Sequence, residues 1–87
     1  MEKTLKIQND EGLHARPAAA LVKEANNFKA DINLVFGDKT VNAKSIMGLM
    51  TLGLTKDAEF TIQANGEDES QAIETLTNLV NDKFNLH

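Results

Sequence analysis

Apolar residues in this chain change their spacing several times, from every second residue to every third or fourth and back again. Alternation is typical of a strand with one buried face, and a repeat of three or four is typical of a helix with one apolar side. These patterns predict the order strand, helix, strand, strand, short helix, strand, helix. Because amphipathic helices must cover a sheet face, we expect an α+β open-faced sandwich with a mostly antiparallel sheet and its other face in water.

The predicted strands are short and are bounded by polar turns. Turn signals stand at Gly37-Asp38 and at Asn65-Gly66, and the first of them suits a tight hairpin. The strands that the alternating residues predict are 2–8, 32–36, 39–43 and 60–64.

Two longer helices are predicted from apolar stripes. The first begins within a residue or two of Pro17, and the last follows Asp68 and Gln71, whose spacing resembles a capping box. The acidic stretch 66–70 is expected to cap this last helix and face solvent, with a recognition role as the less favoured alternative. The stripe residues are Ala18, Leu21, Val22, Ala25 and Phe28 in the first helix, and Ala72, Ile73, Leu76, Leu79 and Val80 in the last.

Length and composition bound the class of function. The 87 residues, 41% hydrophobic and 25% charged, suit one folded domain over residues 1–87 and leave too little for a second core. There is no cysteine for a disulfide or thiolate metal site, and the first ten residues lack the apolar run of a signal peptide or membrane span. A cytoplasmic location is the default expectation. The net charge of −4 argues against binding the nucleic acid backbone.

Residues 45–54, SIMGLMTLGL, depart from the amphipathic pattern. Their large apolar side chains point in most directions around a short helix, so some of them should stay exposed. Two interpretations are open: a small, tightly buried helix, or a methionine-rich docking patch. Ser45 stands where its hydroxyl can cap the helix, and with Lys44 beside it the same helix start could also attract a phosphate.

His14 lies in EGLHARPAA (11–19), between a glycine-led loop and a helix start. A zinc site needs three or four ligands, and the other histidine is His87, so no metal is expected. General-base catalysis would need a nucleophile and an orienting group, so we expect no enzyme turnover. A structural histidine stays open. Against it, Gly12 can expose the ring, and Arg16 and the helix start offer positive charge to phosphoryl oxygens.

A phosphoryl carrier fits these neighbours. A neutral imidazole nitrogen can attack phosphorus, and the P–N bond formed is labile enough to pass the group onward. One conflict remains, because the residue before a proline disfavours helical angles. Arg16 could therefore lie at the helix boundary rather than inside the helix.

The segments GLHARPA (12–18) and NAKSIMGLMTLG (42–53), with the strand and helix order, resemble the histidine-containing phosphocarrier (HPr) family of the bacterial phosphoenolpyruvate:sugar phosphotransferase system. The resemblance covers essentially the whole chain, and two separate motifs at the family's spacing make it specific. It implies a four-stranded antiparallel sheet of order 1-4-2-3 with three helices on one face, and a carrier rather than an enzyme.

The resemblance also implies roles for particular residues. His14 would accept a phosphoryl group on Nδ1 from enzyme I and donate it to IIA domains of sugar permeases, while Arg16 steadies the group. Ser45 would be the regulatory serine that HPr kinase/phosphorylase modifies, read by a catabolite-control regulator. The implied docking face consists of Ala15, Ala19, Ile46, Met47, Leu49 and Met50. No cofactor, metal or membrane insertion is implied, and we expect a monomer.

Two other classes of function remain as alternatives. In the first, the chain is a regulatory module read through Ser45, and His14 is incidental. A catabolite-repression paralogue of the family lacks the active-site histidine, so the presence of His14 argues against that paralogue. In the second, the chain is a small nucleic-acid binder of similar element order, against which the absence of Tyr and Trp speaks.

Overall fold

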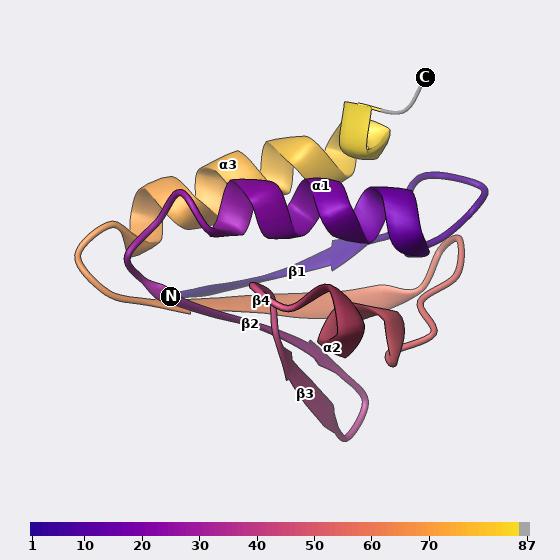
Figure 1. The fold of residues 1–87 in the computed structure, drawn as a ribbon, viewed down its shortest axis with the longest axis horizontal. Helices are drawn as coiled ribbons and strands as arrows, with labels where there is room; N and C mark the ends of the chain where they lie inside the picture. The colour runs from indigo at the N-terminus through magenta and orange to yellow at the C-terminus, as the bar shows by residue number, and fades with distance from the viewer. Residues whose placement is uncertain (86–87) are drawn as a thin grey trace.

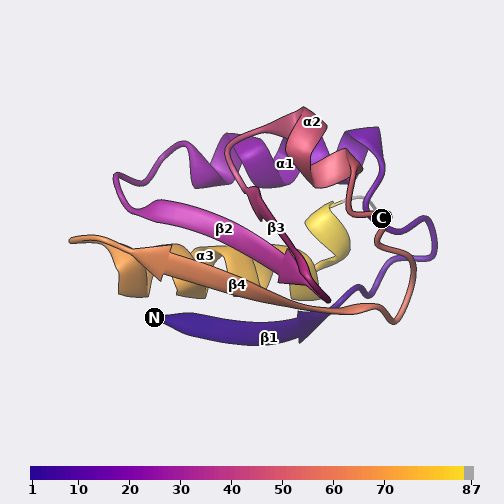
Figure 2. The same ribbon diagram turned by 90° about the horizontal axis from the view of Figure 1, so that it is seen from below.

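A single antiparallel sheet organises the computed structural model of this chain, which describes residues 1–85. Its four strands lie in the order β1-β4-β2-β3, and all neighbouring pairs run antiparallel, as Figure 2 shows from the open side. The strands are β1 (Glu2–Lys6), β2 (Asp31–Phe36), β3 (Lys39–Asn42) and β4 (Glu59–Asn65). All four strands predicted from alternation are present, although β1 is shorter than predicted, and the sheet order implied by the resemblance is confirmed.

The helices cover one side of this sheet. Helix α1 (Ala15–Ala25) and helix α3 (Glu69–Asn81) lie side by side over it, and the short α2 (Ile46–Met50) packs against α1 and β3 (Figure 1). A 3-10 turn, η1 (Lys83–Asn85), follows α3. The apolar stripes of α1 and α3 meet the inward residues of the strands in one core. Fully buried members of this core include Leu21, Ile32, Leu34, Ile62, Leu76 and Val80.

The opposite face of the sheet is polar, as expected of an open-faced sandwich. Thr4 and Thr61 stand across from each other on β1 and β4, and their hydroxyl oxygens lie 3.0 Å apart in an exposed hydrogen bond. Only the inward residues of these strands, such as Leu5 and Phe60, are buried. The period of two in the sequence therefore separates a core face from a solvent face.

Strand β1 ends at Lys6, two residues before the predicted end at residue 8. Ile7 is fully buried but already pairs with the turn before β4. Its N–H donates to the carbonyl of Ala58 (3.0 Å), and its carbonyl accepts from the N–H of Asp57 (2.9 Å). The loop that follows β1 is thereby brought against the segment that leads into β4.

The predicted capping box at the start of α3 is wrong. Asp68 is the N-cap residue but makes no side-chain cap hydrogen bond. Its carboxylate instead accepts from the N–H groups of Lys29 and Ala30, both at 2.9 Å. Asp68 therefore holds the connection between α1 and β2, which is far from it in sequence. The two backbone donors are available because α3 begins beside that connection.

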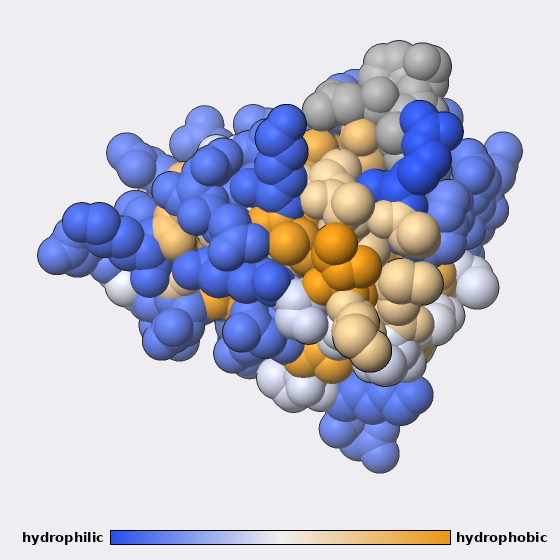
Figure 3. Space-filling view, viewed as in Figure 1, coloured by the Kyte–Doolittle hydropathy of each residue, from blue (hydrophilic) through white to orange (hydrophobic). Residues whose placement is uncertain are grey.

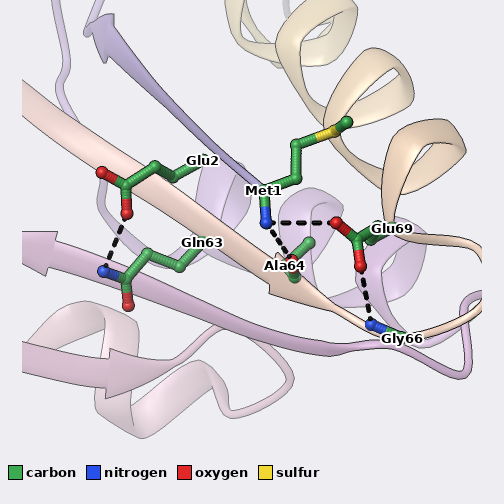
Figure 4. Close-up of polar contacts among 6 residues, drawn as sticks. All are labelled: Met1, Glu2, Gln63, Ala64, Gly66 and Glu69. Carbon is green, nitrogen blue, oxygen red and sulfur yellow. Dashed lines mark hydrogen bonds and ion pairs between the residues drawn. The ribbon is translucent and has the colours of Figure 1, made fainter.

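A second acid of the same stretch holds the start of β1 (Figure 4). Glu69 Oε2 lies 3.1 Å from the Met1 ammonium, which also donates to the carbonyl of Ala64 (3.0 Å). Glu69 Oε1 accepts from the N–H of Gly66 (3.3 Å), which with the ammonium holds the pKa of Glu69 below its usual value. Two of the acidic residues in 66–70 therefore tie elements of the fold together rather than simply facing solvent.

Candidate functional site

The loop that carries His14 has a fixed backbone. The N–H of Leu13 donates to the carbonyl of Leu54 (2.9 Å), which joins the loop to the segment before β4. Gly12 has a φ of +74°, and a Cβ there would lie 2.5 Å from the same carbonyl oxygen, so only glycine fits without strain. The buried Asn9 donates from Nδ2 to the Gly12 carbonyl (2.7 Å). His14 is therefore presented from a defined position.

The His14 ring stands at the start of α1 without bonding to the helix. His14 is the N-cap residue, its backbone is extended, and its side chain makes no cap hydrogen bond. The side chain is 41% exposed, and Nε2 lies 2.9 Å from Oε2 of Glu11. The sequence patterns did not single out this carboxylate. The i, i+3 spacing was a signal for the contact, but the contact also depends on the left-handed turn at Gly12.

The first turn of α1 places positive charge and free donors beside His14. The helix begins at Ala15, so Arg16 lies inside its first turn and is exposed, which settles the conflict raised by the proline. The first helical hydrogen bond runs from the N–H of Ala18 to the carbonyl of His14 (2.9 Å). The N–H groups of Ala15 and Arg16 precede that bond and therefore lack a partner within the helix, whereas Pro17 has no N–H at all.

The start of α2 is built differently. Ser45 is its N-cap, and its Oγ accepts from the N–H of Gly48 (3.2 Å), so the predicted cap is confirmed. The residue is half-buried. The ammonium of the neighbouring Lys44 donates to the carbonyl of Phe28 (2.8 Å), which directs it toward the connection between α1 and β2. The hydroxyl of Ser45 is thus occupied by the helix that it begins.

The exposed apolar residues of α2 adjoin the first half of α1. Met47 is 81% exposed, and Ile46 and Met50 are also exposed, which confirms that large apolar groups stay at the surface. Ala15 and Ala19 are exposed on α1. Figure 3 shows apolar surface continuing from the first half of α1 to the region of α2. We call Ala15, Ala19, Ile46, Met47 and Met50 the apolar face.

Leu49 corrects the docking face that the resemblance implied. Leu49 is fully buried, and Leu52 and Leu54 are almost fully buried. In a helix of five residues, Leu49 lies on the side opposite Met47 and turns toward α1 and the sheet. It supports the apolar face from beneath and offers no surface to a partner.

Within residues 1–85, no group of three or more His, Cys, Asp or Glu side chains could hold a metal ion. His87, the other histidine of the sequence, lies outside the described residues. In the same part of the chain no helix is long and apolar enough to cross a membrane.

Comparison with known proteins gives a consistent result. A family model described as the PTS HPr component phosphorylation site matches residues 1–82. The phosphocarrier protein HPr of Buchnera aphidicola subsp. Schizaphis graminum is 48% identical over 79 residues, covering 91% of this chain and 93% of that protein.

Solved structures agree with this match. HPr from Thermoanaerobacter tengcongensis has a TM-score of 0.95 and 44% identity, and the alignment covers 100% of this chain and 98% of the other. The catabolite-repression protein Crh of Bacillus subtilis, described as a swapped dimer, has a TM-score of 0.78 and 47% identity, with 91% of each chain covered. The alternative of a small nucleic-acid binder receives no support from these matches.

Proposed function

The chain belongs to the HPr family of phosphocarrier proteins of the phosphotransferase system, and on that premise we propose that His14 is the residue that carries the phosphoryl group. The main support for this proposal is the exposed His14 ring at the start of α1. It stands on a fixed loop and makes no hydrogen bond to the helix. A carrier must offer its nucleophile to two partners in turn. An imidazole at the surface satisfies that requirement, whereas a capping or core histidine would not.

The first turn of α1 would balance the charge of the carried group. Phosphoryl transfer needs positioning and neutralisation of the oxygens more than covalent work from the protein. The guanidinium of Arg16 can contact phosphoryl oxygens, and the N–H groups of Ala15 and Arg16 lie at the positive end of the helix dipole. We assign Arg16 the role of steadying the phosphoryl group on His14.

The apolar face would receive the partners. We propose that enzyme I, which loads the carrier, and the IIA domains of sugar permeases, which unload it, both dock on this surface beside His14. Met47 and Met50 suit such use, because unbranched thioether side chains adapt to more than one partner. The two partners would then compete for one surface, as sequential transfer requires.

Ser45 is proposed as the regulatory site, modified by HPr kinase/phosphorylase and read by a catabolite-control regulator. It stands at the start of α2, directly before the exposed residues Ile46 and Met47. A phosphate there would add negative charge at the edge of the apolar face and weaken docking.

We further propose that residues 1–87 act as one domain, as a cytoplasmic monomer. Because Crh is described as a dimer, size measurement in solution tests the oligomeric state directly.

The test is transfer from phosphoenolpyruvate. The protein is incubated with phosphoenolpyruvate, magnesium and enzyme I, and the modified residue is found by mass spectrometry under neutral handling that preserves P–N bonds. One phosphoryl group on His14 is the expected result. The proposal fails if no label appears while the same enzyme I loads another carrier, and the regulatory module would then be the better interpretation.

A further inference from the structure

The contact between Glu11 and His14 bears on which ring nitrogen carries the proton. Glu11 Oε2 lies 2.9 Å from His14 Nε2, a hydrogen-bond distance. An ionised carboxylate has no proton to donate, so the hydrogen in this contact belongs to Nε2. A neutral imidazole carries one N–H, which leaves Nδ1 with its lone pair. We infer that Glu11 is a positioning residue for phosphoryl acceptance, holding the His14 ring by Nε2–H and keeping Nδ1 as the free nucleophile; this inference rests on the proposed function.

The contact is built by the loop and is not an accidental meeting of two long side chains. Gly12 separates the two residues, and its left-handed backbone is enforced by the close approach of the Leu54 carbonyl. Asn9 ties the same turn through its hydrogen bond to the Gly12 carbonyl. The backbones of Glu11 and His14 are therefore held in fixed relative positions, independently of the rotamers of the two side chains.

The adjacent acid of the loop has a different partner. Asp10, the adjacent acid, pairs with Lys56 at 2.9 Å, and that partner holds the pKa of Asp10 below its usual value. Lys56 thus pairs with Asp10. Glu11 is 64% exposed and directs its oxygen to the imidazole, so the loop carries two acids with two different tasks.

The carboxylate also matches the charge that develops during transfer. The Nδ1 lone pair forms the new P–N bond, the P–N bond of a phosphohistidine donor breaks, and its electron pair returns to the donor nitrogen. The proton stays on Nε2, so the ring becomes positive as the bond forms. Glu11 faces that edge and stabilises the positive ring, as carboxylates hydrogen-bonded to catalytic or metal-binding histidines do in other proteins. It lies on the Nε2 side of the ring, away from the incoming phosphoryl oxygens.

The first readout is the tautomer of the free protein. In mildly alkaline buffer, where imidazole is neutral, the ring ¹⁵N shifts of His14 should show a protonated Nε2 and an unprotonated Nδ1. In Glu11→Ala the two shifts should move toward each other, because the second tautomer becomes populated. Asp10→Asn is the matched control, with the same loss of charge one residue away, and should leave the shifts in place. Identical shifts in wild type and Glu11→Ala overturn the inference.

The second readout is the rate of phosphorylation by enzyme I. Glu11→Ala should slow it about two- to fivefold, the range that an exposed ion pair supports. Glu11→Gln keeps an acceptor oxygen without the charge and should fall between that variant and wild type. Equal slowing in Asp10→Asn and Glu11→Ala would assign the effect to net charge and overturn the inference. Absence of label on His14 in the wild type would instead overturn the proposed function, and the two failures are therefore distinct.

Discussion

Helices α1 and α2 both begin beside a proposed phosphorylation site, yet their first turns are built in opposite ways. Before α1, the His14 side chain turns away from the helix and contacts Glu11, so the first N–H groups of the helix stay without a side-chain acceptor. Before α2, the Ser45 hydroxyl accepts from Gly48 and closes the helix start. One helix start is left open, and the other is occupied by its own N-cap.

This difference separates two kinds of phosphorylation. A phosphoryl group on His14 would break no hydrogen bond that holds α1, because the ring contributes none to the helix. A phosphate on Ser45 would act on the oxygen that caps α2, next to the exposed Ile46 and Met47. The first arrangement suits rapid loading and unloading. The second couples modification to the apolar face that partners would use.

The strongest test of the open helix start is His14→Ala. Phosphorylation from phosphoenolpyruvate and enzyme I should be abolished, because the proposed nucleophile is gone. The free energy of unfolding should stay within about 0.5 kcal/mol of wild type, since a half-exposed ring that makes no cap bond contributes little packing. Mass spectrometry and urea denaturation measure the two quantities. Ser45→Ala, which should still be labelled, is the control, and any label retained by His14→Ala contradicts the assignment.

The next largest effect concerns the loop that holds this helix start in place. Gly12→Ala should lower the free energy of unfolding by about 2–4 kcal/mol. The alanine would have to adopt a left-handed backbone, and its Cβ would clash with the Leu54 carbonyl oxygen. Urea denaturation of the purified variant measures this loss.

Gly53, just after α2, supplies the matched control for that change. Its φ is +65°, but a Cβ there would meet nothing within 4 Å. Gly53→Ala should therefore cost only the conformational part, about 1 kcal/mol. Equal losses in the two variants would show that the loop before α1 is not held by close packing against Leu54.

The helices and strands were more predictable from the sequence than the contacts between side chains. Alternation located the strands, and the apolar stripes located α1 and α3, because local periodicity reflects which side of an element is buried. The capping role of Ser45 was also predictable, since a cap acts within one turn of its own helix.

Contacts that depend on tertiary packing were not predictable in the same way. Asp68 has the spacing of a cap, but its carboxylate is taken by the N–H groups of Lys29 and Ala30, which only the packed fold brings near. The resemblance placed Leu49 in the docking face with its exposed neighbours. The short apolar run has no clear period that could separate them, and only packing selects the buried side. Glu11 was missed because its contact depends on a left-handed turn as well as on spacing.

A smaller effect tests the occupied helix start. Ser45→Ala should lower the free energy of unfolding by about 1 kcal/mol, because the N–H of Gly48 loses its acceptor. Ser45→Asp should restore most of that stability, since aspartate also caps, while its charge slows acceptance of phosphate at His14. Urea denaturation and the rate of phosphorylation by enzyme I give the two readouts. A rate in Ser45→Asp equal to wild type would remove Ser45 from the docking surface.

The smallest expected effect concerns Asp68, the N-cap residue of α3. Its carboxylate does not cap the helix but binds the connection between α1 and β2. The N–H of Lys29, and to a lesser degree that of Ala30, hold the pKa of the Asp68 carboxyl below its usual 3.8. A carboxyl whose folded-state pKa is lowered stabilises the fold above its unfolded value and loses that contribution as the pH falls through the folded value. Asp68→Asn should therefore lower stability at neutral pH, but modestly, because asparagine keeps an oxygen for one of the two donors. The difference in stability between Asp68→Asn and wild type should close as the pH falls below 3.8, as followed by urea denaturation across that range.

Glu67→Gln, which removes an exposed carboxylate one residue away, is the control. A gap that persists in acid would mean that Asp68 stabilises the connection between α1 and β2 through packing rather than through its charge.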